Sequence, residues 1–203
     1  MYIPDYYKNE NIEEVKTFLL ENNFAILISA VGGKSWGTHI PLELEKDLEG
    51  NDVLYGHISK LNPQQEHFKN NDEVLAIFSG PNAYVSSSWY KHENVPTWNY
   101  IAVHVYGTIK IIEGEELLQA ITKLVDKYEK KSKCPVRVQE LSAKQMEQIN
   151  GIVGFKISIK EIHPAYKLSQ NRNDEDYHTV IKELESSEDV GSIQVASEMK
   201  KRR

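Results

Sequence analysis

Two neighbouring stretches carry side chains that suit the binding of a phosphate group. GHISKLNPQ places His57, Ser59 and Lys60 where a strand is expected to run into a loop. Their imidazole, hydroxyl and ammonium groups could donate several hydrogen bonds to one phosphate. THIP adds Thr38 and His39, which the alternation of a strand places on opposite faces. Taken on these residues alone, an ordinary polar strand end is the simpler interpretation.

A third polar stretch, KLSQNR, runs from Lys167 to Arg172 and includes Gln170. It packs two cations, a hydroxyl and two amides into six residues just before the last expected helix. In isolation this composition predicts a turn followed by a helix cap.

The common motifs of catalytic and metal sites are missing from the sequence. There is no GxSxG, P-loop, GxGxxG or HExxH motif. The seven histidines never occur three or four residues apart, so a helical metal site is not expected. The single cysteine, Cys134, excludes an internal disulfide and a CxxC metal site. We therefore assign no catalytic residue and no metal ligand from the sequence.

The stretch VPTWNYIAVHVYGTIKII has two chemically different faces when it is read as a strand from Trp98. One face is typical of a core and carries Asn99, Ile101, Val103, Val105, Gly107, Ile109 and Ile111. The opposite face carries Trp98, Tyr100, Ala102, His104, Tyr106, Thr108 and Lys110. Its aromatic side chains are too apolar for water and too polar for a dry interior. This second face is expected to contact a ligand or a partner, or to form a second core layer.

The remaining patterns predict short strands in the first half of the chain and helices in the second. Strands are expected over 24–30, 36–44, 53–59, 73–80, 83–90 and 152–162. Helices are expected over 11–23, 113–132, 142–149 and 174–187, with a short one after Asn62. Strand–helix–strand alternation is missing. The pattern predicts a mainly β fold of the α+β class, an antiparallel barrel decorated with helices.

Length, charge and hydropathy favour a single-domain protein that neither binds nucleic acid directly nor spans a membrane. The 203 residues suit one domain, assigned to 1–185, followed by a polar and flexible tail over 186–203. A formal net charge of −6 gives no basic footprint for nucleic acid, and the only basic cluster is the terminal KKRR. No apolar run suits a membrane span, and the first residues lack a signal-peptide pattern. We expect a cytoplasmic protein without a membrane partner.

Several stretches, in this order, resemble the PaiB family, the FMN-binding negative transcriptional regulators of bacteria. They are MYIP, THIPLEL, LYGHISKLNPQ, GPNAYVSSSWY, VPTWNYIAVHVYG and YKLSQNR. VPTWNY and KLSQNR are the most specific, because neither is a common product of strand or turn chemistry. The resemblance runs from Met1 to about Leu184 and leaves out the tract from Ser186.

The resemblance implies a split β-barrel of the pyridoxamine-phosphate-oxidase type, a homodimer with FMN in a groove at the subunit interface. The oxidases of that superfamily place an arginine and a lysine beside the serine, whereas HISK retains only the lysine. This difference leaves the phosphate clamp one cation weaker. The residues assigned to the cofactor are Thr38, His39, His57, Ser59, Lys60, Trp98, Asn99, Gln170 and Arg172.

The function implied by the resemblance is that of an FMN-binding repressor of protease and sporulation genes. DNA or a protein would be its further partner, although the acidic chain shows no helix-turn-helix and direct DNA binding is not expected. The rival is an FMN-dependent oxidoreductase related to pyridoxamine-phosphate oxidase, or a split-barrel protein that binds haem or flavin. Whether the chain is an enzyme stays open, because a flavin would itself carry the chemistry.

Overall fold

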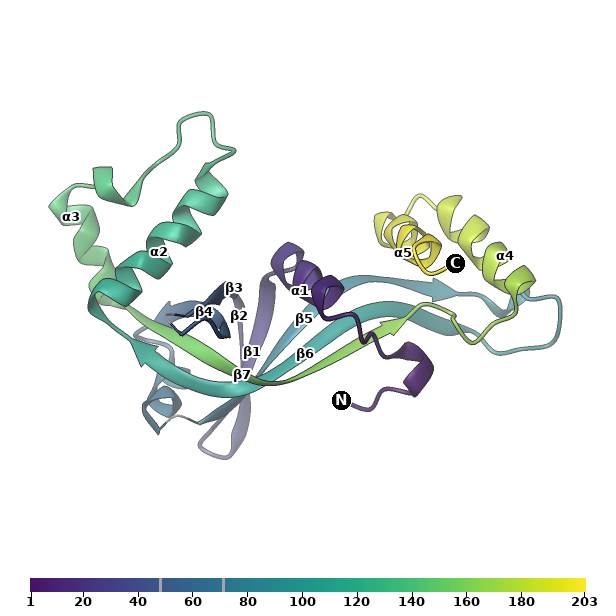
Figure 1. Ribbon diagram of the computed structural model, residues 1–203, viewed down its shortest axis with the longest axis horizontal. Helices are drawn as coiled ribbons and strands as arrows, with labels where there is room; N and C mark the ends of the chain where they lie inside the picture. The colour runs from purple at the N-terminus through teal and green to yellow at the C-terminus, as the bar shows by residue number, and fades with distance from the viewer. Residues whose placement is uncertain (48, 71) are drawn as a thin grey trace. The chain divides into compact units, whose positions relative to one another are not determined.

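Seven strands are hydrogen-bonded in the order β2-β1-β5-β6-β7-β4-β3 in the computed structural model, which describes residues 1–47, 49–70 and 72–203 (Figure 1). β1 pairs with β2 and β5, and β4 pairs with β3 and β7, in antiparallel register. The expected mainly β fold of the α+β class is confirmed. The strands are β1 (Phe24–Val31), β2 (Lys34–Pro41), β3 (Glu43–Lys46), β4 (Asp52–Ser59), β5 (Glu73–Val85), β6 (Thr97–Ile112) and β7 (Ile152–Lys167).

Two of the helices begin directly after residues that the sequence marks as caps. Asn11 accepts a hydrogen bond from the backbone N–H of Glu14, and Ser142 accepts one from the N–H of Gln145. The α-helices are α1 (Ile12–Glu21), α2 (Gly114–Glu129), α3 (Ala143–Met146), α4 (Asp174–Glu185) and α5 (Val190–Lys200). Short 3₁₀ helices cover Asp5–Tyr7, Pro63–Asn70, Ser87–Trp89, Val138–Glu140 and Glu147–Gly151.

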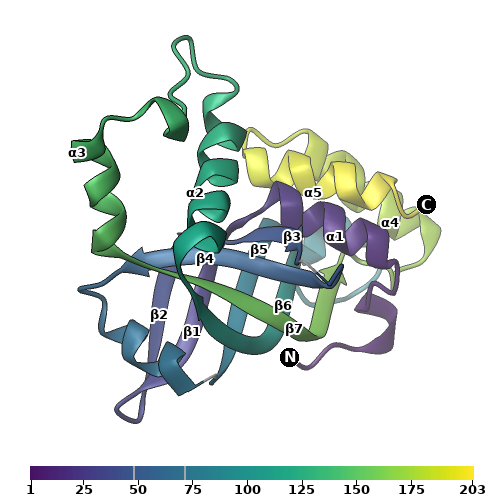
Figure 2. The same cartoon turned by 60° about the vertical axis from the view of Figure 1, so that its left-hand side comes forward.

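The chain forms two units, and β5, β6 and β7 each contribute residues to both. Unit 1 consists of Met1–Phe18, Phe78–His104 and His163–Arg203. Unit 2 consists of Leu19–Ile77 and Val105–Ile162. Unit 2 contains the β1–β2 hairpin, whose strands lie side by side in Figure 2 and pair from Phe24 opposite Pro41 onward.

The alternation expected along β6 is confirmed. Every second residue from Asn99 to Ile109 is buried, while the residues between them are exposed or half-buried. The pattern shifts by one residue at the end of the strand, where Ile112 is buried in place of the expected Ile111. The shift occurs just before Gly114, the first residue of α2, where the chain leaves the sheet.

Two strand boundaries differ from the sequence prediction. The strands expected at 73–80 and 83–90 are one strand, β5, followed by the 3₁₀ turn at Ser87–Trp89. Gly80 looked like a break, but a Cβ atom there would lie 2.6 Å from Cε2 of Phe18, so glycine allows the close approach of this ring. The strand expected at 36–44 ends at Pro41, since proline lacks the N–H that would continue the ladder.

The segment 186–203, expected to be a flexible polar tail, contains helix α5, which lies beside α4 in unit 1 (Figure 1). α5 buries Ser192, Val195, Ala196 and Met199. These positions follow the helical spacing of three and four residues, but two of the side chains are small, so the apolar face is inconspicuous in the sequence. The expectation of a tail was wrong because a narrow face of small residues suffices where two helices pack closely.

The basic end of the chain is also paired rather than free. Lys200 pairs with Glu185, Lys201 with Glu198 at 2.6 Å, Arg202 with Glu14, and Arg203 with Asp174 at 2.8 Å. All four cations of KKRR therefore have a carboxylate partner within unit 1.

Replacing Met199 by alanine should lower the free energy of unfolding by about 2–5 kcal/mol, the range for truncating a buried methionine. Met199 is fully buried, and its carbonyl oxygen accepts a hydrogen bond of 2.8 Å from the hydroxyl of Tyr177. Ile193→Ala is the matched control on the same helix, because Ile193 is 44% exposed. Denaturant unfolding of both variants would measure the difference, and equal losses would show that α5 does not pack as described.

Candidate functional site

The turn after β4 brings together two of the predicted phosphate ligands. The backbone N–H of Asn62 donates to the carbonyl of Ser59 at 2.9 Å, and the N–H of Leu61 donates to the Ser59 hydroxyl at 3.1 Å. The N–H of Lys60 donates to the carbonyl of Gly151 at 2.9 Å, which fixes the backbone of this turn. The side chains of Ser59 and Lys60 are exposed at a well-supported strand end. We call Ser59, Lys60, Asn62, Thr38 and Gln64 the Lys60 cluster.

The polar residues beneath this turn hold the backbone in place. Gln64 is fully buried, and its amide nitrogen donates to the hydroxyl of Ser29 at 3.0 Å and to the carbonyl of Leu27 at 3.2 Å. Thr38 donates to Gln64 at 2.6 Å and accepts from the side chain of Asn62 at 2.9 Å. Thr38 therefore positions the β1–β2 hairpin against the turn instead of presenting a free hydroxyl.

Thr38 and His39 occupy opposite faces of β2, as the alternation predicts. Thr38 pairs with Leu27 and is half-buried, whereas His39 pairs with Ile26 and is exposed. The ring of His39 lies 6.4 Å from that of Phe24, centroid to centroid. The two residues therefore do not contact one group from the same side of the strand.

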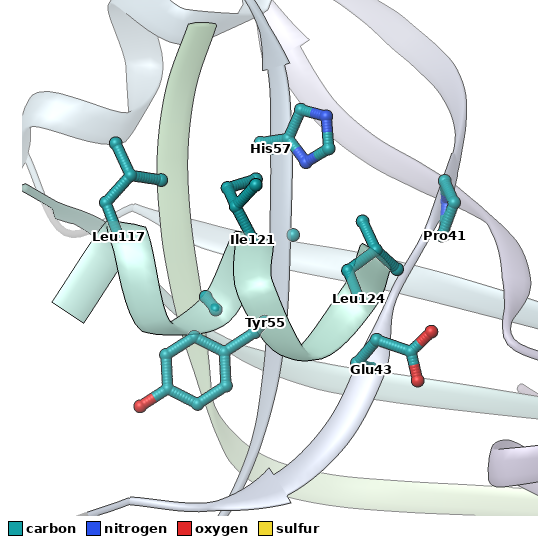
Figure 3. Close-up of a pocket in the computed structure, with 9 residues that line it drawn as sticks. Pro41, Glu43, Tyr55, His57, Leu117, Ile121 and Leu124 are labelled. Atoms are coloured by element: carbon teal, nitrogen blue, oxygen red, sulfur yellow. The ribbon is translucent and has the colours of Figure 1, made fainter. Parts of the chain in front are cut away.

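His57 is half-buried beside helix α2. It lines a pocket with Tyr55, Leu117, Ile121 and Leu124, whose side chains Figure 3 shows around it. The pocket has a volume of about 10 Å³, roughly the room for a single water molecule. Partial burial lowers the pKa of His57, because desolvation disfavours the charged form of the ring. On this side of β4 there is no space for a phosphate beside the imidazole.

A second group of cations lies in unit 1, where β7 ends. The Arg172 guanidinium carbon is 4.6 Å from the ring centroid of Tyr90, and Lys167 Nζ donates to Thr97 Oγ1 at 2.6 Å. Burial, and then the neighbouring Arg172, lower the pKa of Lys167. Neither cation has a carboxylate partner among the residues that the structure describes. We call Lys167, Arg172, Thr97, Tyr90 and Tyr7 the Arg172 cluster.

An anionic or electron-rich group would be stabilised at the Arg172 cluster, because two half-buried cations repel each other until an anion lies nearby. Tyr7 adds a ring whose centroid is 6.0 Å from Lys167 Nζ. The sequence pointed to Arg172 but did not single out Lys167. The signal was present in the two cations of KLSQNR, five residues apart.

Asn99 and Gln170, which were predicted to contact the cofactor, form hydrogen bonds within unit 1 instead. The Asn99 side chain is fully buried and exchanges hydrogen bonds with the hydroxyl of Ser169 at 2.9 and 3.1 Å. Ser169 has a φ of 61°, a left-handed conformation that this contact supports. Gln170 donates to the carbonyl of Tyr166 and accepts from the N–H of Leu168 at 2.7 Å. Asn99 and Gln170 therefore shape the turn after β7 instead of facing a ligand.

Trp98, unlike its buried neighbour Asn99, is 54% exposed. Tyr100, His104 and Tyr106, which follow on the same face of β6, are half-buried. A flavin contact for Trp98 stays a prediction.

Comparison with known proteins decides the family. Residues 1–161 match the family model described as "Putative FMN-binding domain". The protein of Bacillus subtilis (strain 168) named "Protease synthase and sporulation protein PAI 2" is 46% identical over 200 residues, which cover 98% of this chain and 96% of that protein. This chain belongs to the PaiB family. The match extends beyond Ser186, where the sequence resemblance had stopped, and it supports FMN as the cofactor of this PaiB-family chain.

Solved structures share the fold of this PaiB-family chain at low sequence identity. The flavocytochrome Anf3 from Azotobacter vinelandii is 18% identical with a TM-score of 0.65, over 87% of this chain and 78% of that one. The FAD and heme binding protein from Mycobacterium smegmatis is 15% identical with a TM-score of 0.63, over 85% and 79%. These likenesses confirm the expected split β-barrel as the fold.

Within 1–47, 49–70 and 72–203, no three histidine, cysteine, aspartate or glutamate side chains gather as metal ligands. The same ranges contain no helix with both the length and the apolar character for crossing a membrane.

The lowered pKa of the half-buried His57 should make stability depend on pH. As the pH falls below the ordinary histidine pKa of 6.5, the unfolded chain takes up a proton before folded His57 does, so the free energy of unfolding decreases. His57→Gln removes this contribution, and the stability of the variant should fall less between about pH 7.5 and about pH 5.5. Denaturant unfolding at both pH values would measure the two slopes, and equal slopes would contradict a lowered pKa of His57.

Proposed function

We propose that this chain is a homodimeric, FMN-binding regulatory protein of the cytoplasm, with the FMN phosphate held at the Lys60 cluster. The observation that carries the phosphate assignment is the Ser59–Lys60 pair, exposed on a turn that backbone and side-chain hydrogen bonds fix. Lys60 has no carboxylate partner in the described part of the chain, so its charge is available to a ligand. Membership of the PaiB family supplies the cofactor.

The phosphate of FMN suits these two side chains. A phosphate monoester carries close to two negative charges at neutral pH, and its lost hydration has to be replaced by cations and hydrogen-bond donors. The ammonium of Lys60 and the hydroxyl of Ser59 start from adjacent residues and can converge on one anion. Bound FMN would supply the redox chemistry, while the chain's own residues would bind and orient it.

The Arg172 cluster is the second place in the chain that suits a negatively charged or electron-rich group. We assign Arg172 and Lys167 to such a group of the flavin or of its reaction partner. Two observations support the assignment: neither cation has a carboxylate partner within 1–47, 49–70 and 72–203, and the pKa of Lys167 is lowered, which an anion would raise again. His39 is exposed on the hairpin and stays a predicted flavin contact. Of the predicted cofactor residues, His57 has the least support, because the pocket beside it is small.

A homodimer is supported by an apolar face in unit 2 that the chain itself leaves partly uncovered. The strand register places Ile26 beside Ile77 and Ile28 beside Leu75 on one face of β1 and β5. All four are half-buried, and Phe24 on the same face is 65% exposed. A contiguous apolar face of this kind is typical of a surface that another chain covers.

The regulatory role is proposed from the relative named for protease synthesis and sporulation. The paired ends of Lys200 to Arg203 and the net charge of −6 argue against direct binding of DNA. A protein partner, or a change in the bound flavin, is the route to regulation that these charges favour. The free, exposed thiol of Cys134 is consistent with the reducing cytoplasm.

Replacing Phe24 by glutamate should weaken the dimer, because the new charge would be desolvated on an apolar interface. We expect a cost of about 3 kcal/mol or more, at least roughly a hundredfold in the dissociation constant. Leu61→Glu is the control, since Leu61 is 92% exposed outside this face. Light scattering across a dilution series would give the masses, and a wild-type mass of one chain at every concentration would exclude the homodimer.

Replacing Lys60 by alanine should cost about 1.5–3 kcal/mol of FMN affinity, the range for a charge-assisted hydrogen bond. This corresponds to about a ten- to hundredfold rise in the dissociation constant. Riboflavin lacks the phosphate and should bind both proteins equally. Titration of the purified proteins with each flavin, followed by visible absorption, would measure the four affinities.

Lys46→Ala provides the matched control for this titration. Lys46 is an exposed lysine of the same unit, but it pairs with Asp52 at 2.8 Å. Its loss should leave FMN affinity unchanged. Equal FMN affinity of wild type and Lys60→Ala would overturn the phosphate assignment, and a colourless wild type that fails to take up FMN would overturn the proposed function itself.

A further inference from the structure

Unit 1 contains a groove whose lining includes no residue of the Lys60 cluster or of the Arg172 cluster. It is formed by the ends of β5 and β6 and by α4 and α5, which Figure 1 shows running side by side. Its volume is about 490 Å³, within the usual range for small-molecule sites. The side chains that give the groove its chemistry are Tyr84, Trp89, Trp98, Glu183, Ser187 and Asp189.

The first part of the groove is a pair of exposed aromatic rings. Tyr84 on β5 and Trp98 on β6 are 47% and 54% exposed. Their ring centroids are 6.0 Å apart at an interplanar angle of 70°, an edge-to-face arrangement. Large rings fixed against each other and open to solvent are a ready surface for a ligand with apolar or cationic groups.

The second part is a negative wall. Glu183 is half-buried near the end of α4, and no hydrogen bond or ion pair of its carboxylate occurs among the described residues. Asp189 caps α5 by accepting from the N–H of Ser192 at 2.7 Å, and this bond lowers the pKa of its carboxyl group. The lining contains no lysine, arginine or histidine, so its formal charge is negative.

We propose that this groove binds a small organic cation, an aliphatic or quaternary ammonium ion. Aromatic faces attract such cations through the ring quadrupole, and the carboxylates supply the compensating charge. A phosphate-bearing ligand such as FMN would be repelled by Glu183 and Asp189. Trp98 is therefore assigned to this groove in place of the predicted flavin contact, and the proposal does not depend on the phosphate site at Lys60.

Choline is a suitable probe, because its neutral analogue 3,3-dimethylbutan-1-ol has nearly the same shape. The chain has three tryptophans, of which Trp89 and Trp98 line the groove and Trp36 belongs to unit 2. In a titration of the full chain followed by NMR, choline should shift the indole N–H signals of Trp89 and Trp98 and leave that of Trp36 unchanged. The neutral analogue should bind at least about tenfold more weakly.

Substitutions that remove a carboxylate or an aromatic ring test whether choline binds in this groove. Glu183→Gln should weaken choline binding about five- to tenfold, and Tyr84→Leu about two- to fivefold. Glu188→Gln is the matched control, because Glu188 is an exposed acid between α4 and α5 that does not line the groove. It should leave the affinity unchanged.

Three outcomes would overturn the proposal. They are equal binding of choline and the neutral analogue, unchanged signals of Trp89 and Trp98 under saturating choline, and an equal loss of affinity in Glu183→Gln and Glu188→Gln. A thermal unfolding scan of each variant would confirm that it is folded before it is titrated.

Discussion

The period-two alternation of β6 is the constraint on which both units depend. The strand supplies residues to unit 1 up to His104 and to unit 2 from Val105, and it buries one side throughout. Because a shift of one residue would exchange its faces, the register of this strand is strongly specified. Asn99 is the polar member of the buried face, and it holds the turn that carries Ser169 and the Arg172 cluster. The other face of β6, which begins with Trp98, is exposed or half-buried.

Hydrogen bonds within the chain distinguish the residues that support the two turns from those that are free to contact a ligand. The hairpin is fixed to the turn after β4 by hydrogen bonds among the side chains of Thr38, Asn62 and Gln64. After β7, the side chain of Gln170 is hydrogen-bonded to the backbone of its own turn. Close to these two turns, Lys60, Lys167 and Arg172 have no carboxylate partner among the residues that the structure describes. This division is common in binding sites, since the ligand-contacting groups need a rigid support that is itself fully hydrogen-bonded.

The sequence predicts the features that depend on local rules. The faces of β6, the β1–β2 hairpin, helix α2 and the caps Asn11 and Ser142 all follow from periodicity and capping, and the structure contains them. It does not predict features that depend on contacts between distant residues. Gly80 looks like a strand break until Phe18 is placed against it, and Gln64 looks like a loop residue until Leu27 and Ser29 surround its amide.

The same limit applies to the candidate site. Ser59 and Lys60 are neighbours in the chain, so their proximity needed no fold. Asn99 and Gln170 belong to specific motifs, but only the structure shows that their amides are turned inward. Helix α5 escaped notice for a related reason, since its packed face consists partly of serine and alanine.

The order in which the two units are built into the chain has a consequence for synthesis on the ribosome. Every segment of unit 2 precedes residue 163, whereas unit 1 includes the segment His163–Arg203, which contains α4 and α5. The contact between Arg202 and Glu14 joins residues 188 positions apart. Since chains emerge from the N-terminus and domains fold as units, unit 2 can fold while unit 1 still waits for its final helices. Until then the buried sides of β5 and β6 in unit 1 lack part of their cover, so translation of the C-terminal helices ends the period in which the nascent chain is exposed to chaperones and to aggregation.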